Sequence, residues 1–231
     1  MLSSIALAAD ALIKSAIRNI SGEIGRKLRY QYYSRRLGSC GKNVIIDEGV
    51  IIQGAKDIHL ADNVWIDRYC ILMAGKVDMP AEGSKVNTNA AYKHQVGELH
   101  IGSNVHITPY CLIQAHGGVS IGNDCGLGAG AKLYSLTNLP ADPANPERIV
   151  YYSWGGPMAQ ICAPIVLQDN VGVGLGSVVL PGITIEKNSF VAPYSVVMTP
   201  IKENSSISGN PARRVKDRFA VAGKAATEQA A

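Results

Sequence analysis

Aliphatic residues recur at every sixth position along most of the chain. The next residue is often Gly, Ala or Asp, and a compact side chain follows four positions after each aliphatic one. A period of six does not fit an amphipathic helix, which needs 3.6. It fits short parallel strands wound into a solenoid with tight corners. The recurring positions are Ile46, Ile52, Leu60, Ile66 and Leu72; Ile101, Ile107, Ile113, Ile121, Leu127 and Leu133; and Leu167, Val173, Val179, Ile185, Val191 and Val197.

This repeat resembles that of the left-handed β-helix (hexapeptide-repeat) acyltransferases over residues 44–218. The segment 209–215, GNPARRV, is similar to the one that closes the helix in bacterial sugar O-acetyltransferases of polysaccharide biosynthesis. The resemblance implies an all-β fold, a left-handed parallel β-helix with three hexapeptides per turn of a triangular prism. It also implies a homotrimer that transfers an acetyl group from acetyl-CoA to a sugar-type acceptor, with no metal.

Four insertions interrupt the six-residue spacing, at 52–60, 72–101, 113–121 and 133–167. If Ile46 lies on the first face of the prism, every insertion falls between the second face and the third. We therefore expect all of them to leave the prism along one edge. Loops on a rigid scaffold tend to carry binding and catalysis. In the resembled family, a projecting loop packs over a neighbouring subunit and walls the acceptor pocket, a role that suits 73–98 or 134–163.

Acetyl transfer needs a base, and histidine has the best-matched ordinary pKa. His116 lies in the short third insertion beside two glycines, so it is the leading candidate, with His94 in the long second insertion as the alternative. His59, His100 and His106 flank aliphatic positions and are expected to face outward from the strands.

The resemblance places a catalytic histidine one coil later, where this chain has Asn138, and asparagine cannot act as a base. His116 is similar in placement to the histidine of the sugar N-acetyltransferases of this fold, although Gly117 follows it instead of an acidic residue. His116 as base with Asn138 orienting the acceptor, another base, and loss of catalysis all remain open. His94, Tyr134 and Trp154 are the candidate substrate-binding residues.

The cofactor site implied by the resemblance lies in the unbroken last block. Backbone groups there would meet the pantetheine arm of CoA, and two cations would meet its phosphates, since arginine binds phosphate well. Turn formation is an equally good explanation of the glycines. The candidates are Gly174, Gly176, Ser177, Ala192, Arg213 and Lys216.

Residues 1–43 form a helical, basic arm that lacks the six-residue period, and 219–231 form a tail. The arm has a net charge of +6, which leaves −2 for the remainder of the +4 chain. A helix that caps the solenoid is favoured over one that lies on a membrane surface, and nucleic acid is not expected. The start lacks the features of a signal peptide, no apolar run could span a bilayer, and the cysteines suggest no disulfide framework. We therefore expect a cytoplasmic protein, with a peripheral position at the inner membrane as an open alternative.

Three other functions stay open. The first is a sugar N-acetyltransferase, and the second is a non-catalytic β-helix scaffold, suggested by Asn138. The third is a metalloenzyme similar to the γ-carbonic anhydrases, for which His94 and His116 are the candidate ligands at an unpersuasive spacing.

Overall fold

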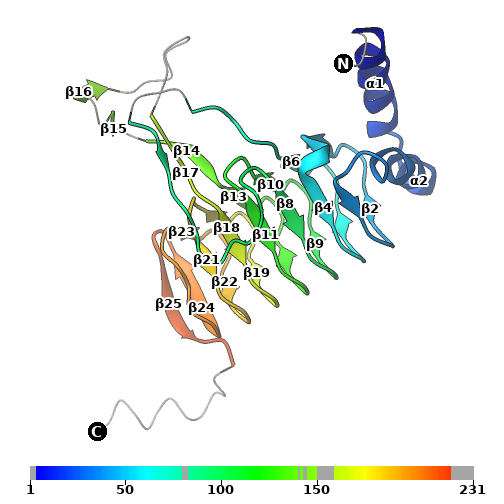
Figure 1. Cartoon of the computed structure of the whole chain (residues 1–231). Helices are drawn as coiled ribbons and strands as arrows, with labels where there is room; N and C mark the ends of the chain where they lie inside the picture. Colours follow the sequence, from blue (N-terminus) through cyan, green and yellow to red (C-terminus); the bar gives the residue numbers. More distant parts are fainter. Residues whose placement is uncertain (1–3, 80–82, 140, 143–144, 150–158, 220–231) are drawn as a thin grey trace, which may run out of the picture.

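The computed structural model describes residues 4–79, 83–139, 141–142, 145–149 and 159–219. In this part of the chain, three sheets of stacked short strands form the faces of a left-handed β-helix (Figure 1). Sheet A contains β1 (Ser39–Cys40), β4 (Ile58–Leu60), β8 (Leu99–Ile101), β11 (Val119–Ile121), β18 (Ile165–Leu167) and β21 (Thr184–Ile185). Sheet B contains β2 (Ile45–Ile46), β5 (Trp65–Ile66), β9 (His106–Ile107), β12 (Gly126–Leu127), β19 (Gly172–Val173), β22 (Phe190–Val191), β24 (Ser205–Gly209) and β25 (Ala212–Asp217). Sheet C contains β3 (Ile51–Gln53), β6 (Ile71–Met73), β10 (Leu112–Gln114), β13 (Lys132–Tyr134), β20 (Val178–Val179) and β23 (Val196–Val197).

The predicted inward positions form the core. Every aliphatic residue of the six-residue repeat is buried, and equivalent residues pair in register between coils, as Ile107 does with Ile66 and Leu127. Cys70, Cys111 and Cys125 each follow an aliphatic residue of the repeat by four positions; they also face inward and are buried as compact apolar side chains. Side chains of neighbouring coils therefore stack in columns, and burial of these columns stabilises the solenoid.

The corner between sheets A and B is built from left-handed residues that stack from coil to coil. Asn63 and Asn104 both have φ of 59°, a conformation that asparagine tolerates better than most residues. The Asn63 side-chain amide donates to Asn104 (3.0 Å), and that of Asn104 donates to Asp124 (2.9 Å). Each coil thus satisfies the polar groups of the next.

The four insertions leave along one edge, as the sequence predicts, since each connects a strand of sheet C to a strand of sheet A. The first contains a short 3₁₀ helix, η1 (Ala55–Asp57). The second and fourth supply a small separate sheet of β7 (Lys85–Val86), β14 (Leu136–Asn138) and β17 (Gln160–Cys162), and a strand pair of β15 (Ala141–Asp142) and β16 (Asn145–Ile149) follows β14.

The amino-terminal arm contains helices α1 (Ser4–Arg18) and α2 (Gly22–Tyr33). The buried Arg29 donates from Nε to the Ile46 carbonyl (2.7 Å) and from a terminal nitrogen to the Ile20 carbonyl (2.7 Å). Arg26 donates from Nε to Asp47 at 2.6 Å. These contacts hold α2 on the first coil, which supports the capping interpretation. One boundary needs correction: β1 already pairs with β4 inside the arm, so the β-helix begins before residue 44.

The other end of the parallel stack is closed by a hairpin. β24 extends sheet B in parallel, and β25 then folds back antiparallel to β24. Among the residues that the structure describes, no helix has the length and apolar character needed to span a bilayer.

Candidate active site

His116 lies on the insertion edge, two residues after β10 ends. Its Nδ1 is 2.8 Å from the carbonyl oxygen of Gly75, in the long second insertion. A carbonyl oxygen only accepts, so the Nδ1 of His116 carries the proton, and Nε2 keeps its lone pair in the neutral ring. The half-buried imidazole is therefore held as the tautomer that a general base requires. The carboxylate that the sequence lacks after His116 is replaced by a main-chain carbonyl.

The buried Ser135 fixes the backbone beside this histidine. Its Oγ accepts from the Gly117 N–H (2.8 Å) and donates to the Gln114 carbonyl (2.6 Å). The Leu136 N–H in turn donates to Oε1 of Gln114 at 3.2 Å. Consecutive coils are thus joined on both sides of His116, and sequence reasoning missed Ser135 because a serine beside a strand gives no sign of its partners.

The second insertion lies along the outer face of sheet A and is attached at several points. The Asn89 amide donates to the Thr184 hydroxyl (2.9 Å) and to the Pro164 carbonyl (3.1 Å). The ring of Tyr92 covers Gly118, where φ is +100° and an added Cβ would lie 2.6 Å from the ring. Gly118 therefore permits both the turn after His116 and the close approach of the loop.

The structure does not join Asn138 to His116. Asn138 is on β14, and its Oδ1 accepts from the Gln160 amide at 3.1 Å. Tyr134 ends β13 and pairs in register with Gln114, so it lies on the coil next to that of His116. Trp154 falls outside the described residues. The predicted roles of Asn138 and Tyr134 toward an acceptor remain predictions.

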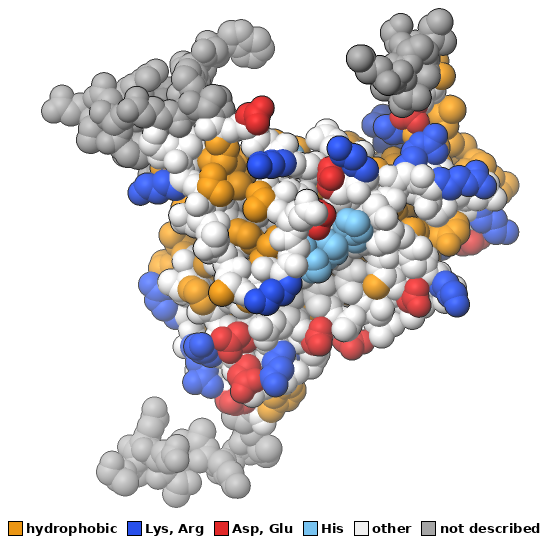
Figure 2. Space-filling view, in the orientation of Figure 1, with side chains coloured by type: hydrophobic (Ala, Val, Ile, Leu, Met, Phe, Trp, Pro, Cys, Tyr) orange, Lys and Arg blue, Asp and Glu red, His pale blue; other side chains and the backbone are white. Residues whose placement is uncertain are grey.

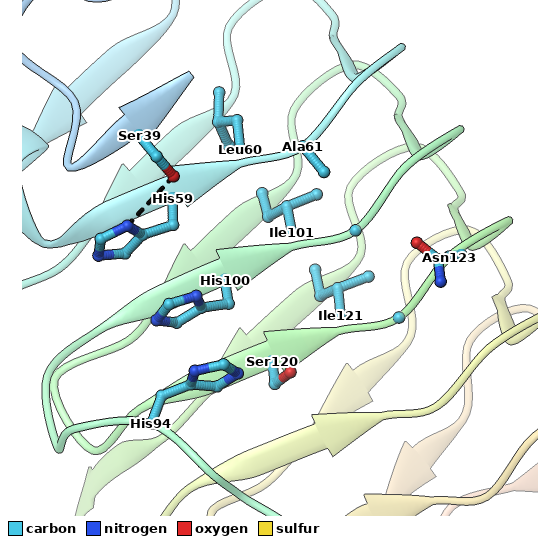
Figure 3. A pocket seen from close by; sticks show the side chains of 12 residues that line it. Ser39, His59, Leu60, Ala61, His94, His100, Ile101, Ser120, Ile121 and Asn123 are labelled. Carbon is cyan, nitrogen blue, oxygen red and sulfur yellow. Dashed lines mark hydrogen bonds between the residues drawn. The ribbon is translucent and has the colours of Figure 1, made fainter. Parts of the chain in front are cut away.

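His94 lies on the outer face of sheet A rather than beside His116. Its ring stacks on that of His100 (centroids 3.5 Å apart), and the His100 ring stacks on that of His59 (4.3 Å). His59 and His100 face outward, as predicted, but they form a column with His94. The column lines a hollow of about 320 Å³ (Figure 3). The sequence analysis did not identify this cluster.

Glu98 joins the column at its edge. A carboxylate oxygen of Glu98 lies 2.8 Å from Nε2 of His100 and 3.2 Å from the Gln95 N–H. Burial lowers the pKa of His100 more than the Glu98 contact raises it. Burial raises the pKa of Glu98, but the hydrogen bonds from His100 and Gln95 together leave that pKa below its usual value. Figure 2 shows the histidines gathered in one patch on this face of the molecule.

No family model matches the chain. It is 23% identical over 185 residues to dTDP-4-amino-4,6-dideoxy-D-glucose acyltransferase of Escherichia coli, covering 78% of this chain and 82% of that one. The fold matches that of AntD, an N-acyltransferase from Bacillus cereus (TM-score 0.64, 20% identity, 82% and 88% covered). It also matches the hexapeptide-repeat acetyltransferase VCA0836 of Vibrio cholerae (0.57, 18%, 94% and 90%). The chain has the fold of the hexapeptide-repeat acyltransferases and is similar to them in sequence. The predicted fold and enzyme class are thereby confirmed.

The candidate CoA residues on the corner between sheets B and C are largely used by the fold. The Gly174, Gly176 and Ala192 N–H groups donate to carbonyls of neighbouring coils at 2.8 Å each. Ser177 is buried, and its hydroxyl donates to the Ala192 carbonyl at 2.9 Å. An added Cβ at Gly174 would lie 2.6 Å from the Val191 carbonyl oxygen. These small residues are thus explained by coil stacking, and any contact they make with CoA would use carbonyl oxygens.

The two predicted cations stand on the closing hairpin. Arg213 and Lys216 are exposed on β25, where long basic side chains can reach a phosphate in solvent. Neighbouring Arg214 is 3.6 Å from Asp217 and is partly neutralised by it. The geometry is compatible with phosphate binding by Arg213 and Lys216, which remains a prediction.

Proposed function

We propose that this chain transfers an acetyl group from acetyl-CoA to a sugar acceptor, with His116 as the general base. The observation that carries the proposal is the contact of His116 Nδ1 with the Gly75 carbonyl. This contact leaves Nε2 able to take a proton. His116 also lies on the edge that carries all four insertions.

The reaction needs one proton transfer at this atom. As the acceptor oxygen or nitrogen attacks the thioester carbon, its proton passes to His116 Nε2, and a tetrahedral intermediate forms. When the intermediate collapses, the carbon–sulfur bond breaks, and the CoA sulfur leaves with the proton returned from the imidazolium. A main-chain carbonyl at Nδ1 stabilises that imidazolium as it forms.

The acceptor that we favour is a nucleotide-linked amino sugar. The printed name of the E. coli relative specifies such a sugar, and AntD is an N-acyltransferase solved in complex with dTDP-4-amino-4,6-dideoxyglucose and coenzyme A. VCA0836 is solved in complex with acetyl-CoA. A hydroxyl acceptor in surface-polysaccharide synthesis, which the closing segment 209–215 suggested, is the second candidate.

A homotrimer is part of the proposal. Large apolar side chains are exposed on the outer face of sheet B and at the corner that follows it, and such patches mark protein interfaces. Tyr110 is 64% exposed and Tyr194 is 73% exposed. The patch consists of Tyr110, Leu175, Phe190 and Tyr194. Light scattering should give a mass three times 24.5 kDa, and a monomer mass would exclude the trimer.

The proposal includes a location for the protein, in the cytoplasm at the surface of the inner membrane. Helix α1 exposes Leu12 (72%) and Ile13 (46%), with Lys14 and Arg18 nearby. Apolar and basic side chains together suit an anionic membrane surface. Sedimentation with anionic lipid vesicles tests this contact, and neutral vesicles are the control. If the protein sediments with neither kind of vesicle, the arm has only its capping role.

The decisive experiment measures acceptor-dependent release of CoA with a thiol reagent. Purified protein is incubated with acetyl-CoA and a panel of nucleotide sugars, each amino sugar paired with the analogue that has a hydroxyl instead. We expect turnover with a member of the amino-sugar set. His116→Ala should lower kcat by about 10²–10⁴-fold without changing the Kd for acetyl-CoA.

His106→Ala is the matched control, because it makes the same change at an outward-facing histidine on sheet B whose ring stacks on Trp65. It should keep full activity. If His116→Ala keeps most of the activity, His116 is not the base. If no sugar in the panel releases CoA, the acceptor class is wrong.

A further inference from the structure

We propose that His59, His100 and Glu98 form a binding site for a divalent transition-metal ion of the zinc type on the outer face of sheet A. One nitrogen of each ring and one oxygen of the carboxylate all lie within 4.8 Å of one another. The site does not include His116, and its carboxylate comes from the end of the second insertion. It does not depend on the proposed acyl transfer.

The donor set suits this class of ion. Imidazole nitrogen and carboxylate oxygen are ordinary zinc ligands, and two histidines with one carboxylate leave a fourth position for water. Zinc lies about 2.0–2.2 Å from such atoms, so two donors of one tetrahedral ion are about 3.3–3.6 Å apart. The donor atoms lie within 4.8 Å of one another, so they have to close by up to about an ångström, and the two stacked rings have to tilt toward one ion.

The fold brings the two rings together. His59 on β4 and His100 on β8 are direct partners in the parallel register of sheet A. Both side chains point away from the core, and their rings are stacked with an interplanar angle of 6° (Figure 3). Adjacent strands are about 4.8 Å apart, so the sheet itself sets the spacing of these donors.

Neighbouring groups limit the movement of the donors. The His59 ring packs on Gly38, where an added Cβ would lie 2.4 Å from Cε1, and its Nδ1 is 3.2 Å from the Ser39 hydroxyl. The Gln95 N–H holds the Glu98 carboxylate (3.2 Å), and the Glu98 carbonyl accepts from the Tyr92 hydroxyl at 2.8 Å. Such outer contacts orient ligands and raise metal affinity.

The ion would join two coils to the end of the long second insertion. Glu98 directly precedes β8, and His94 from the same insertion stacks on His100. Half-buried side chains line the site, with 23% of the His100 side chain and 21% of the Glu98 side chain exposed. A bound ion at this position would stabilise the loop against sheet A.

The test is direct titration of the full-length chain, freed of metal with a chelator, with Zn²⁺ in the calorimeter and with Co²⁺ by visible absorption. We expect one equivalent per chain. His100→Phe keeps a flat ring for stacking but removes the donor, and it should weaken binding by about tenfold or more. Glu98→Gln should weaken binding similarly, with no loss of ring packing.

His106→Phe is the matched control, since it makes the same change at an outward-facing histidine outside the cluster. It should bind Zn²⁺ as the wild type does. The melting temperature should rise with Zn²⁺ in wild type and His106→Phe, and should not rise in Glu98→Gln. Absence of saturable binding, unchanged affinity in both cluster variants, or an equal loss in His106→Phe would overturn the proposal.

Discussion

The corner between sheets A and B and the edge between sheets C and A are built from the same repeat but differ in how their polar groups are paired. At the corner, asparagine and aspartate side chains form a column in which each side chain hydrogen-bonds to that of the next coil, as Asn104 does with Asp124 (2.9 Å). At the edge, insertions separate the coils, and polar groups find partners far away in sequence, as His116 does with Gly75. Two corners of this solenoid thus stay regular, and the third edge carries all four insertions and the proposed base His116.

The core lies behind both regions, so truncation of a core side chain should lower the free energy of unfolding equally on each face. Ile107 on sheet B and Ile113 on sheet C are completely buried. Ile107→Ala and Ile113→Ala should each lower the free energy of unfolding by about 2–5 kcal/mol, because each leaves a cavity. Guanidinium unfolding measures this. A markedly smaller cost for Ile113→Ala would mean that packing is looser next to the insertion edge.

The cap on the first coil should be sensitive to acid. Burial raises the pKa of Asp47, but hydrogen bonds from Arg26 and Trp65 outweigh it and leave the pKa below its usual 3.8. Because the folded value is lowered, the contribution of Asp47 is fully present above about pH 3.8 and is lost as pH falls through the folded value. Asp47→Asn should cost about 1.5–3 kcal/mol at pH 7.

Denaturant unfolding at pH 7 and at successively lower pH tests this prediction. The difference between wild type and Asp47→Asn should shrink in acid. A difference that is constant from pH 7 down to the acid limit would show that the ion pair does not hold the cap.

On the insertion edge, Ser135→Ala should affect both stability and activity. It leaves the Gly117 N–H without its partner and leaves the Gln114 carbonyl with only the main-chain N–H of residue 135 (3.1 Å), at a cost of about 1–3 kcal/mol. The backbone beside His116 then loses its position, so kcat should fall while the Kd for acetyl-CoA stays the same. A stability loss with unchanged kcat would separate Ser135 from the site.

On the regular corner, Asn104→Ala should affect stability alone. Alanine at φ of 59° costs about 1–2 kcal/mol, and the hydrogen bonds to Asn63 and Asp124 are lost as well. Asn104→Gly relieves the backbone strain and should recover part of the loss. Thermal unfolding of both variants, with kcat as the second measurement, checks this. A fall in kcat for Asn104→Ala would show that the corner affects activity as well as stability.

The sequence could predict the scaffold because its cause is local. A buried aliphatic residue at every sixth position, such as Ile107 followed by Ile113, is required by the coil geometry itself. The shared edge of the insertions also follows from counting faces. β1 escaped prediction because Ser39–Cys40 has no aliphatic residue of the repeat, and pairing with β4 alone makes it a strand.

The site could be predicted only in part, because its contacts join residues whose separation is set by loop length. His59 and His100 are register partners, yet 41 positions separate them, since the long second insertion lies between their coils. The partner of His116 is a main-chain carbonyl, which no residue type reveals. His116 is a candidate from sequence because a histidine beside two glycines inside a short insertion is a local signal.

The most direct test of the account is a crystal structure of the protein with CoA and its sugar acceptor. The account predicts that the reacting acceptor atom lies about 2.6–3.2 Å from His116 Nε2, with Nδ1 still on the Gly75 carbonyl and the CoA sulfur near the acceptor atom. An acceptor and CoA sulfur bound away from His116, for example beside Asn138 or on the outer face of sheet A, would contradict it.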